Sequence, residues 1–220
     1  MKFLRFAALA VAAFTLSACF DLDQDVAIHR DGSGHYAVAV TAEGELGQAM
    51  KTDKRNVLAP NAASSAVTVA GDTVTKTSSV DFASLSALKL DGEQVSLKVL
   101  SAGFLGITPS RVRFRYVIRI GHVRRAQSGG DDGVRRAVAS GMFGDHHYRF
   151  TATLPGSVAR IAKVEIGGVE IKPEVSGDFY HGHTIRWQMP LARMLTAQQI
   201  VFEAEFSAIG SFKDVTSSAR

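Results

Sequence analysis

The chain has 220 residues, with 25 Lys and Arg against 21 Asp and Glu, which leaves a small excess of positive charge. This length is enough for one domain with a sizeable core, and the nearly balanced charge does not call for nucleic acid as a partner. A single cysteine excludes an internal disulfide.

The N-terminus has the pattern of a bacterial lipoprotein signal. Lys2 and Arg5 precede an apolar run over residues 6–15, and Leu16-Ser-Ala-Cys19 follows. The run is shorter than the about 20 residues that cross a bilayer as a helix, so it is interpreted as a removable signal peptide. The quartet resembles the lipobox, whose cysteine is joined to diacylglycerol and becomes the first mature residue. We therefore expect a signal peptide over residues 1–18 and acyl chains such as palmitate on Cys19.

An ordinary secretory signal followed by a chance cysteine is the alternative. Lipidation explains why an exported chain carries one unpaired cysteine, and two or three acyl chains anchor a protein stably. Phe20 stands where many inner-membrane lipoproteins have an aspartate, so in a Gram-negative cell the outer membrane is favoured.

Residues 19–25 are predicted to form an acidic, acylated tether. Asp21, Asp23 and Asp25 alternate like the opening of a calcium loop. Val26 and Gly32 occupy the positions where that loop needs glycine and glutamate, so calcium binding is not expected.

Extended segments outnumber helical ones in the rest of the chain. Two hairpins are predicted first, across Arg30-Asp-Gly-Ser-Gly34 and across Gly71-Asp72. A helix over residues 45–58, a helical turn over 84–88 and a strand over 94–100 are expected next.

The strand over residues 111–120 has the clearest alternation. Val112, Phe114, Tyr116, Ile118 and Ile120 share one face, and Arg111, Arg113, Arg115 and Arg119 share the other. The glycine-rich segment 121–147 is predicted to be a mobile insertion, with further basic residues at Arg124, Arg125, Arg135 and Arg136.

Further strands are predicted over residues 148–154, 164–166, 169–171, 183–188 and 200–206, with a short helix from Pro190 to about residue 199. Residues 213–220 are expected to be a polar tail. The predicted fold class is α+β: a largely antiparallel β-sheet with few short helices, in a single domain over residues 26–212.

Several of these features together suggest a family. Cys19, the Arg30–Gly34 hairpin, the strand leading to Tyr148-Arg-Phe-Thr-Ala-Thr-Leu-Pro-Gly156, and Thr184-Ile-Arg-Trp187 before a final strand resemble the LppM-like bacterial lipoproteins. The resemblance covers most of the mature chain. It implies an exported, membrane-tethered sheet domain with an apolar cavity that handles lipid or glycolipid. Some relatives have a transmembrane segment near the C-terminus, and this chain departs from them there.

The eight arginines named above are candidates for facing a membrane or another anionic partner, such as lipid headgroups. The alternative is a solvated sheet face neutralised by the neighbouring strand that carries Glu203 and Glu205. The two interpretations remain open at this point.

His181 and His183 are the weak candidates for a metal site, since neighbours two apart in a strand point to one side. A third ligand would have to come from Asp178 or from His146 and His147. Polar residues in a turn are the simpler interpretation, and no cofactor is expected.

The sequence contains no nucleophile elbow, no phosphate-cradling loop and no second cysteine, so an enzyme is disfavoured. The leading hypothesis is a non-catalytic, membrane-anchored envelope lipoprotein that binds a lipid-like ligand at the membrane surface. The alternatives are a structural or assembly factor that binds another envelope protein, and a metal-dependent enzyme that uses histidines.

Overall fold

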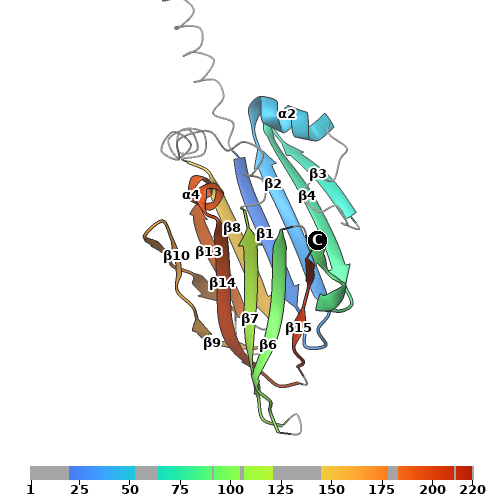
Figure 1. The fold of residues 1–220 in the computed structure, drawn as a ribbon. Helices are drawn as coiled ribbons and strands as arrows, with labels where there is room; N and C mark the ends of the chain where they lie inside the picture. Colours follow the sequence, from blue (N-terminus) through green and yellow to red (C-terminus); the bar gives the residue numbers. More distant parts are fainter. Residues whose placement is uncertain are drawn as a thin grey trace, which may run out of the picture.

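Two β-sheets pack face to face in the computed structural model (Figure 1). The structure describes residues 20–52, 64–90, 92–104, 107–120, 145–177, 183–210 and 212–219. Each sheet turns its apolar side chains toward the other, as alternation along the strands predicts. The shared core therefore lies between the sheets.

The larger sheet has seven strands in the order β12-β13-β8-β1-β2-β4-β3. Their bounds are β1 Phe20–Ile28, β2 Gly34–Ala42, β3 Ser64–Ala70, β4 Thr73–Phe82, β8 His147–Leu154, β12 Glu174–Ser176 and β13 His183–Pro190. All neighbours are antiparallel except the central pair of β1 and β8, which is parallel. The N-terminal strand is thus hydrogen-bonded on both sides in the middle of the sheet.

The second sheet has five strands in the order β15-β6-β7-β14-β9, all antiparallel. Their bounds are β6 Glu93–Ser101, β7 Ser110–Arg119, β9 Ser157–Ile161, β14 Gln199–Ala208 and β15 Val215–Thr216. Two small pairs complete the strands: the hairpin of β10 Val164–Ile166 with β11 Val169–Ile171, and β5 Lys89–Leu90 with β16 Ser218–Ala219.

The predicted α+β class is wrong, because the chain is mostly β. The described helices are short: α2 Gly44–Thr52, the 3-10 turn η1 Leu85–Ala87, and α4 Leu191–Thr196. In Figure 1 both α2 and α4 lie at the upper end of the sandwich. Each sheet covers the apolar face of the other, so no face is left for a helical layer to bury.

All the predicted strands are present, as are the hairpins predicted across residues 30–34 and 71–72 and the one formed by the strands predicted over 164–166 and 169–171. The turns carry glycines with positive φ, Gly32 at 82° and Gly71 at 62°, where a side chain would be strained. Gly34 is required for another reason: a Cβ there would lie 2.1 Å from the Ala27 carbonyl oxygen. β9 and β12 were not predicted, and the segment 121–144 lies outside the described residues.

Two boundary predictions need correction. β1 begins at Phe20, so the residues assigned to a tether are the first part of a central strand. Asp21 and Asp23 pair with Arg149 on β8, which explains acidic residues inside a strand. The supposed polar tail also pairs with the sandwich, since β15 bonds to β6 and β16 to β5.

Aromatic rings fill the core where the two sheets meet. Tyr116 of β7 stacks on Phe150 of β8 at 4.4 Å between ring centroids, and Phe202 of β14 lies 4.8 Å from Phe150 and 5.1 Å from Trp187. These residues are fully buried. Rings in such arrangements add to the apolar burial that holds the sheets together.

A polar network crosses the same interface. The Glu93 carboxylate on β6 accepts hydrogen bonds from Tyr36 Oη (2.8 Å), Tyr116 Oη (2.5 Å) and Gln24 Nε2 (2.9 Å). Tyr148 Oη donates to Gln24 Oε1 at 2.5 Å. Burial, followed by the nearby Glu93 charge, raises the pKa of all three tyrosines well above the usual value.

These tyrosines predict a loss of stability at alkaline pH. Above about pH 10 an unfolded tyrosine ionises, whereas the folded ones keep their protons, so the unfolded state binds fewer protons. The free energy of unfolding should then fall as pH rises, by about 1.4 kcal/mol per pH unit for each tyrosine. Urea unfolding of the non-acylated protein at several pH values measures this slope.

The variant Tyr148→Phe should reduce that slope by the contribution of one tyrosine. Thr153→Val is the matched control, because it removes a hydroxyl that hydrogen-bonds Thr184 at 3.2 Å and does not ionise in this range. If Tyr148→Phe kept the wild-type slope, the protonated state of the network would not contribute to folding.

Candidate functional site

The predicted basic face lies on the outer side of the five-stranded sheet. Arg111, Arg113 and Arg115 project from β7, while Val112, Phe114 and Tyr116 between them are buried. The β7–β14 register places Arg113 opposite Glu205 and Arg115 opposite Glu203. The acidic strand considered in the alternative interpretation is therefore the immediate neighbour.

Ion pairs connect the two strands. Arg111 Nη2 lies 2.9 Å and Arg113 Nη2 3.1 Å from the two Glu205 oxygens. Arg113 Nε is 3.3 Å from Glu203 Oε1, and Arg115 Nε is 3.7 Å from Glu203 Oε2. The hydrogen bonds from Arg113 and then Arg111 lower the pKa of Glu205, whose side chain is only 8% exposed.

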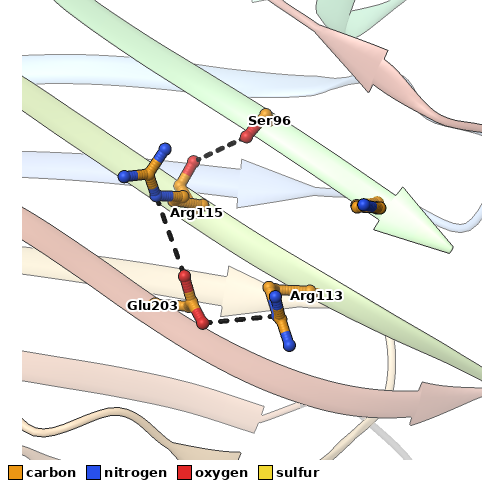
Figure 2. A pocket seen from close by; sticks show the side chains of 5 residues that line it. Ser96, Arg113, Arg115 and Glu203 are labelled. Carbon is orange, nitrogen blue, oxygen red and sulfur yellow. Dashed lines mark hydrogen bonds and ion pairs between the residues drawn. The ribbon is translucent and has the colours of Figure 1, made fainter. Parts of the chain in front are cut away.

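A groove crosses this face beside the ion pairs. It has a volume of about 340 Å³ and is lined by Ser96, Lys98, Arg113, Arg115 and Glu203, from strands β6, β7 and β14. Figure 2 shows Arg113 and Arg115 directed at Glu203 from either side, with Ser96 across β7 from it. The groove thus combines three cations with one carboxylate.

The other five predicted arginines do not line this groove in the part of the chain that the structure describes. Arg119 is exposed at the end of β7 and does not line the groove. Arg124, Arg125, Arg135 and Arg136 lie outside the described residues. The residues that flank their segment can be placed, however: Ile120 N donates to Gln198 O, and Leu191 N, at the start of α4, donates to His146 O. Both flanks therefore lie at the end of the sandwich where α4 is found.

The chain enters the described structure at this same end. Cys19 lies outside the described residues, but its neighbour Phe20 opens β1. The Phe20 backbone N–H donates to His146 Nδ1 at 2.9 Å. We call the end that carries Phe20, His146 and α4 the anchor end.

A cleft opens between the sheets at the opposite end, which we call the distal end. It has a volume of about 290 Å³. Leu85 and Leu97 are among its apolar lining residues, together with Phe212 and Val215, and the charged side chains around it are Arg30, Asp31 and Lys213. Apolar walls beside charged groups suit a ligand that has an apolar chain and a polar or anionic head.

Exposed apolar side chains also gather at the distal end. Phe104 and Ile107, in the β6–β7 connection, are 70% and 72% exposed, and Ile209 after β14 is 52% exposed. Ser110 Oγ accepts a hydrogen bond from Gly103 N and donates to Gly210 O, which ties these two connections together.

The histidines are not brought together as a metal site would require. His181 lies outside the described residues. His183 pairs with Leu154 at one end of β8, whereas His147 begins β8 at the other end, so the full strand separates them. In the part of the chain that the structure describes, no three His, Cys, Asp or Glu side chains are grouped to hold a metal.

Several residues that line the groove and the distal cleft were not predicted as site residues from the sequence. Lys98 and Ser96 line the groove from β6, and alternation in the predicted strand over 94–100 places both on one face, so this signal was present. The distal cleft combines residues distant in sequence, Arg30, Leu85 and Phe212 among them, and no local pattern marks it.

Comparisons with known proteins add little. No protein-family model and no curated protein sequence matches the chain. The NMR structure of the folded domain of LppM from Mycobacterium tuberculosis is similar, with a TM-score of 0.38, 11% identity, and coverage of 86% of this chain and 90% of that one. The similarity is a weak one and concerns the fold alone.

The ion pairs predict unequal effects of two matched substitutions. Glu205→Gln should lower the free energy of unfolding by about 2 kcal/mol, because it leaves Arg111 and Arg113 without their shared, largely buried carboxylate. The Glu203 side chain is 26% exposed, so Glu203→Gln should lower the free energy of unfolding by less than about 1 kcal/mol. Urea unfolding near neutral pH measures both.

The pH dependence checks the cause. Because the folded-state pKa of Glu205 is lowered, its contribution is present above the unfolded pKa and is lost as pH falls through the folded value. The difference between wild type and Glu205→Gln should therefore shrink toward about pH 3. A difference that stays constant with pH would assign the loss to packing instead.

Proposed function

We propose that this protein is a non-catalytic lipoprotein of the bacterial envelope that is anchored by acyl chains on Cys19 and binds a lipid-like ligand while held at the membrane surface. The lipobox supports the anchor, and Phe20 after Cys19 favours the outer membrane in a Gram-negative cell. No described helix is long and apolar enough to span a bilayer.

The observation that carries the membrane-facing orientation is the shared position of two features at the anchor end. β1 begins one residue after Cys19, and both flanks of the arginine-bearing segment 121–144 lie at this end. Basic residues near an anionic membrane contribute about 1 kcal/mol each, so this arrangement favours one orientation on the surface.

The distal cleft supports the ligand. Leu85 and Leu97 belong to the hydrophobic core, so the cleft leads from the surface to an apolar interior. Arg30 and Lys213 can hold an anionic or hydroxylated head outside it. A lipid-like molecule in this cleft would be held at the end of the domain that points away from the anchor.

A second candidate is an assembly factor that binds another envelope protein. The exposed Phe104, Ile107 and Ile209 favour it, since apolar side chains that gather at one exposed end of a protein mark an interaction site. In this candidate the protein presents its distal end to a partner and holds no lipid.

The anchor is tested by the intact mass of the membrane-extracted protein and by Cys19→Ala. We expect a mass equal to the chain from residue 19 plus acyl chains, and a variant that is neither processed nor held by the membrane. An unmodified Cys19, or a variant that fractionates like wild type, would remove the anchor from the proposal.

The ligand is tested by organic extraction of the non-acylated protein of residues 20–220, purified without detergent. We expect co-purified lipid, and about tenfold less of it in the double variant Arg30→Gln/Lys213→Gln, because two charged groups at the cleft are lost. The double variant Lys51→Gln/Lys172→Gln changes two exposed lysines outside the cleft and is the charge-matched control. An extract that contains no lipid, together with a captured envelope protein, would favour the second candidate.

A further inference from the structure

The groove on the five-stranded sheet has a different charge balance from the other ion-pair clusters on the described surface. Arg149 pairs with two carboxylates, those of Asp21 and Asp23, and Lys163 pairs with Glu165 and Glu170. Around the groove the proportion is reversed, because three arginines, Arg111, Arg113 and Arg115, share two carboxylates, those of Glu203 and Glu205. The excess is therefore local to this face.

Lys98 increases this excess. The β6–β7 register places Lys98 directly opposite Arg113, and like charges at opposite positions of neighbouring strands are destabilising. Within the described residues no ion-pair partner is found for Lys98. An anion placed between the two cations would offset their repulsion.

The donors in the groove are arranged along two neighbouring rows. One row is Lys98 and Arg113, and the next is Ser96 and Arg115. The Arg115 side chain is 46% exposed and that of Arg113 is 37% exposed, with the Arg113 Nε itself buried. Among the described residues, Ser96 Oγ donates one hydrogen bond, a long one of 3.5 Å, to the Arg115 carbonyl oxygen.

We propose that this groove binds a phosphate monoester, with Lys98, Arg113 and Arg115 as its cationic ligands and Ser96 as a hydroxyl donor. Guanidinium groups match phosphate oxygens with paired N–H donors, and the lysine ammonium adds a point charge. The four cations Arg111, Arg113, Arg115 and Lys98 face two carboxylates, Glu203 and Glu205, which leaves two positive charges uncompensated. A phosphate monoester carries about −1.5 to −2 at pH 7, which balances them, whereas a carboxylate or a phosphodiester carries one charge.

This site is separate from the proposed lipid cleft and from the anchor end. The groove lies on the side of the sandwich. Arg119 ends β7, and four strand positions, about 13 Å along the strand, separate it from Arg115. Charges at the anchor end are therefore beyond the Debye length of about 8 Å at physiological salt. The phosphate group must reach the groove on a soluble molecule or on a lipid whose head extends along the side of the domain.

The test uses the mature protein extracted in an uncharged detergent and titrated with inorganic phosphate, followed by the arginine Nε–H signals in NMR spectra. We expect saturable shifts of the Arg113 and Arg115 signals. Lys98→Gln and Arg115→Gln should each weaken binding by about tenfold, because each removes one of three cations. Arg119→Gln makes the same charge change on the same strand outside the groove and should change binding less than about twofold.

The variant Glu203→Gln should change phosphate binding in the opposite direction. It removes the carboxylate that lines the groove, Glu203, and should strengthen phosphate binding severalfold, while leaving the cations in place. Lowering the pH below about 6 should weaken binding to wild type, since phosphate then loses one negative charge.

The source of the phosphate is distinguished by a second probe, water-soluble dihexanoyl phosphatidic acid. Tighter binding than inorganic phosphate, lost in Arg115→Gln, would support the site and indicate a lipid. Equal affinity would support the site and indicate a phosphorylated soluble molecule or glycan. Shifts that do not saturate, or equal losses in Arg115→Gln and Arg119→Gln, would overturn the proposal in favour of non-specific attraction. Because none of these readouts depends on acylation or on the distal cleft, the site can fail while the proposed function stands.

Discussion

The contact on which the sandwich depends is the one between a carboxylate and tyrosine hydroxyls at its centre. Glu93 belongs to one sheet and receives hydrogen bonds from Gln24 and Tyr36 of the other, as well as from Tyr116 of its own. Apolar side chains can slide past one another, but a carboxylate that needs several donors fixes the relative position of the two sheets. The stacking of Tyr116 on Phe150 follows from that position.

The outer face of the five-stranded sheet uses charge in another way. Glu205 is largely buried and closes its ion pairs with Arg111 and Arg113, so that pair belongs to the structure. Glu203, Arg115 and Lys98 are more open and leave positive charge in excess. Strand β14 therefore supports the fold through Glu205 and borders the proposed anion site through Glu203. Arg113 takes part in both.

Alternation along the strands predicted most of the sheet, as the buried face of Val112, Phe114 and Tyr116 illustrates. The α+β class was predicted wrongly, because the spacing of residues in a possible helix does not reveal whether a helix or a second sheet covers the apolar face of a sheet. Asp21 and Asp23 were assigned to a tether, since their partner Arg149 is distant in sequence and joins them only through the parallel β1–β8 pair. The arginine face was recognisable from one strand, whereas the distal cleft needs four separate segments and was not.

One consequence follows from β1 starting at Phe20. With the proposed anchor on Cys19, a pull from the membrane would run along the axis of a strand bonded to β2 on one side and β8 on the other. Tension in this direction loads the ladder hydrogen bonds together in shear, instead of peeling them apart one after another. The proposed anchor would therefore hold the domain through a central strand that is hydrogen-bonded on both sides.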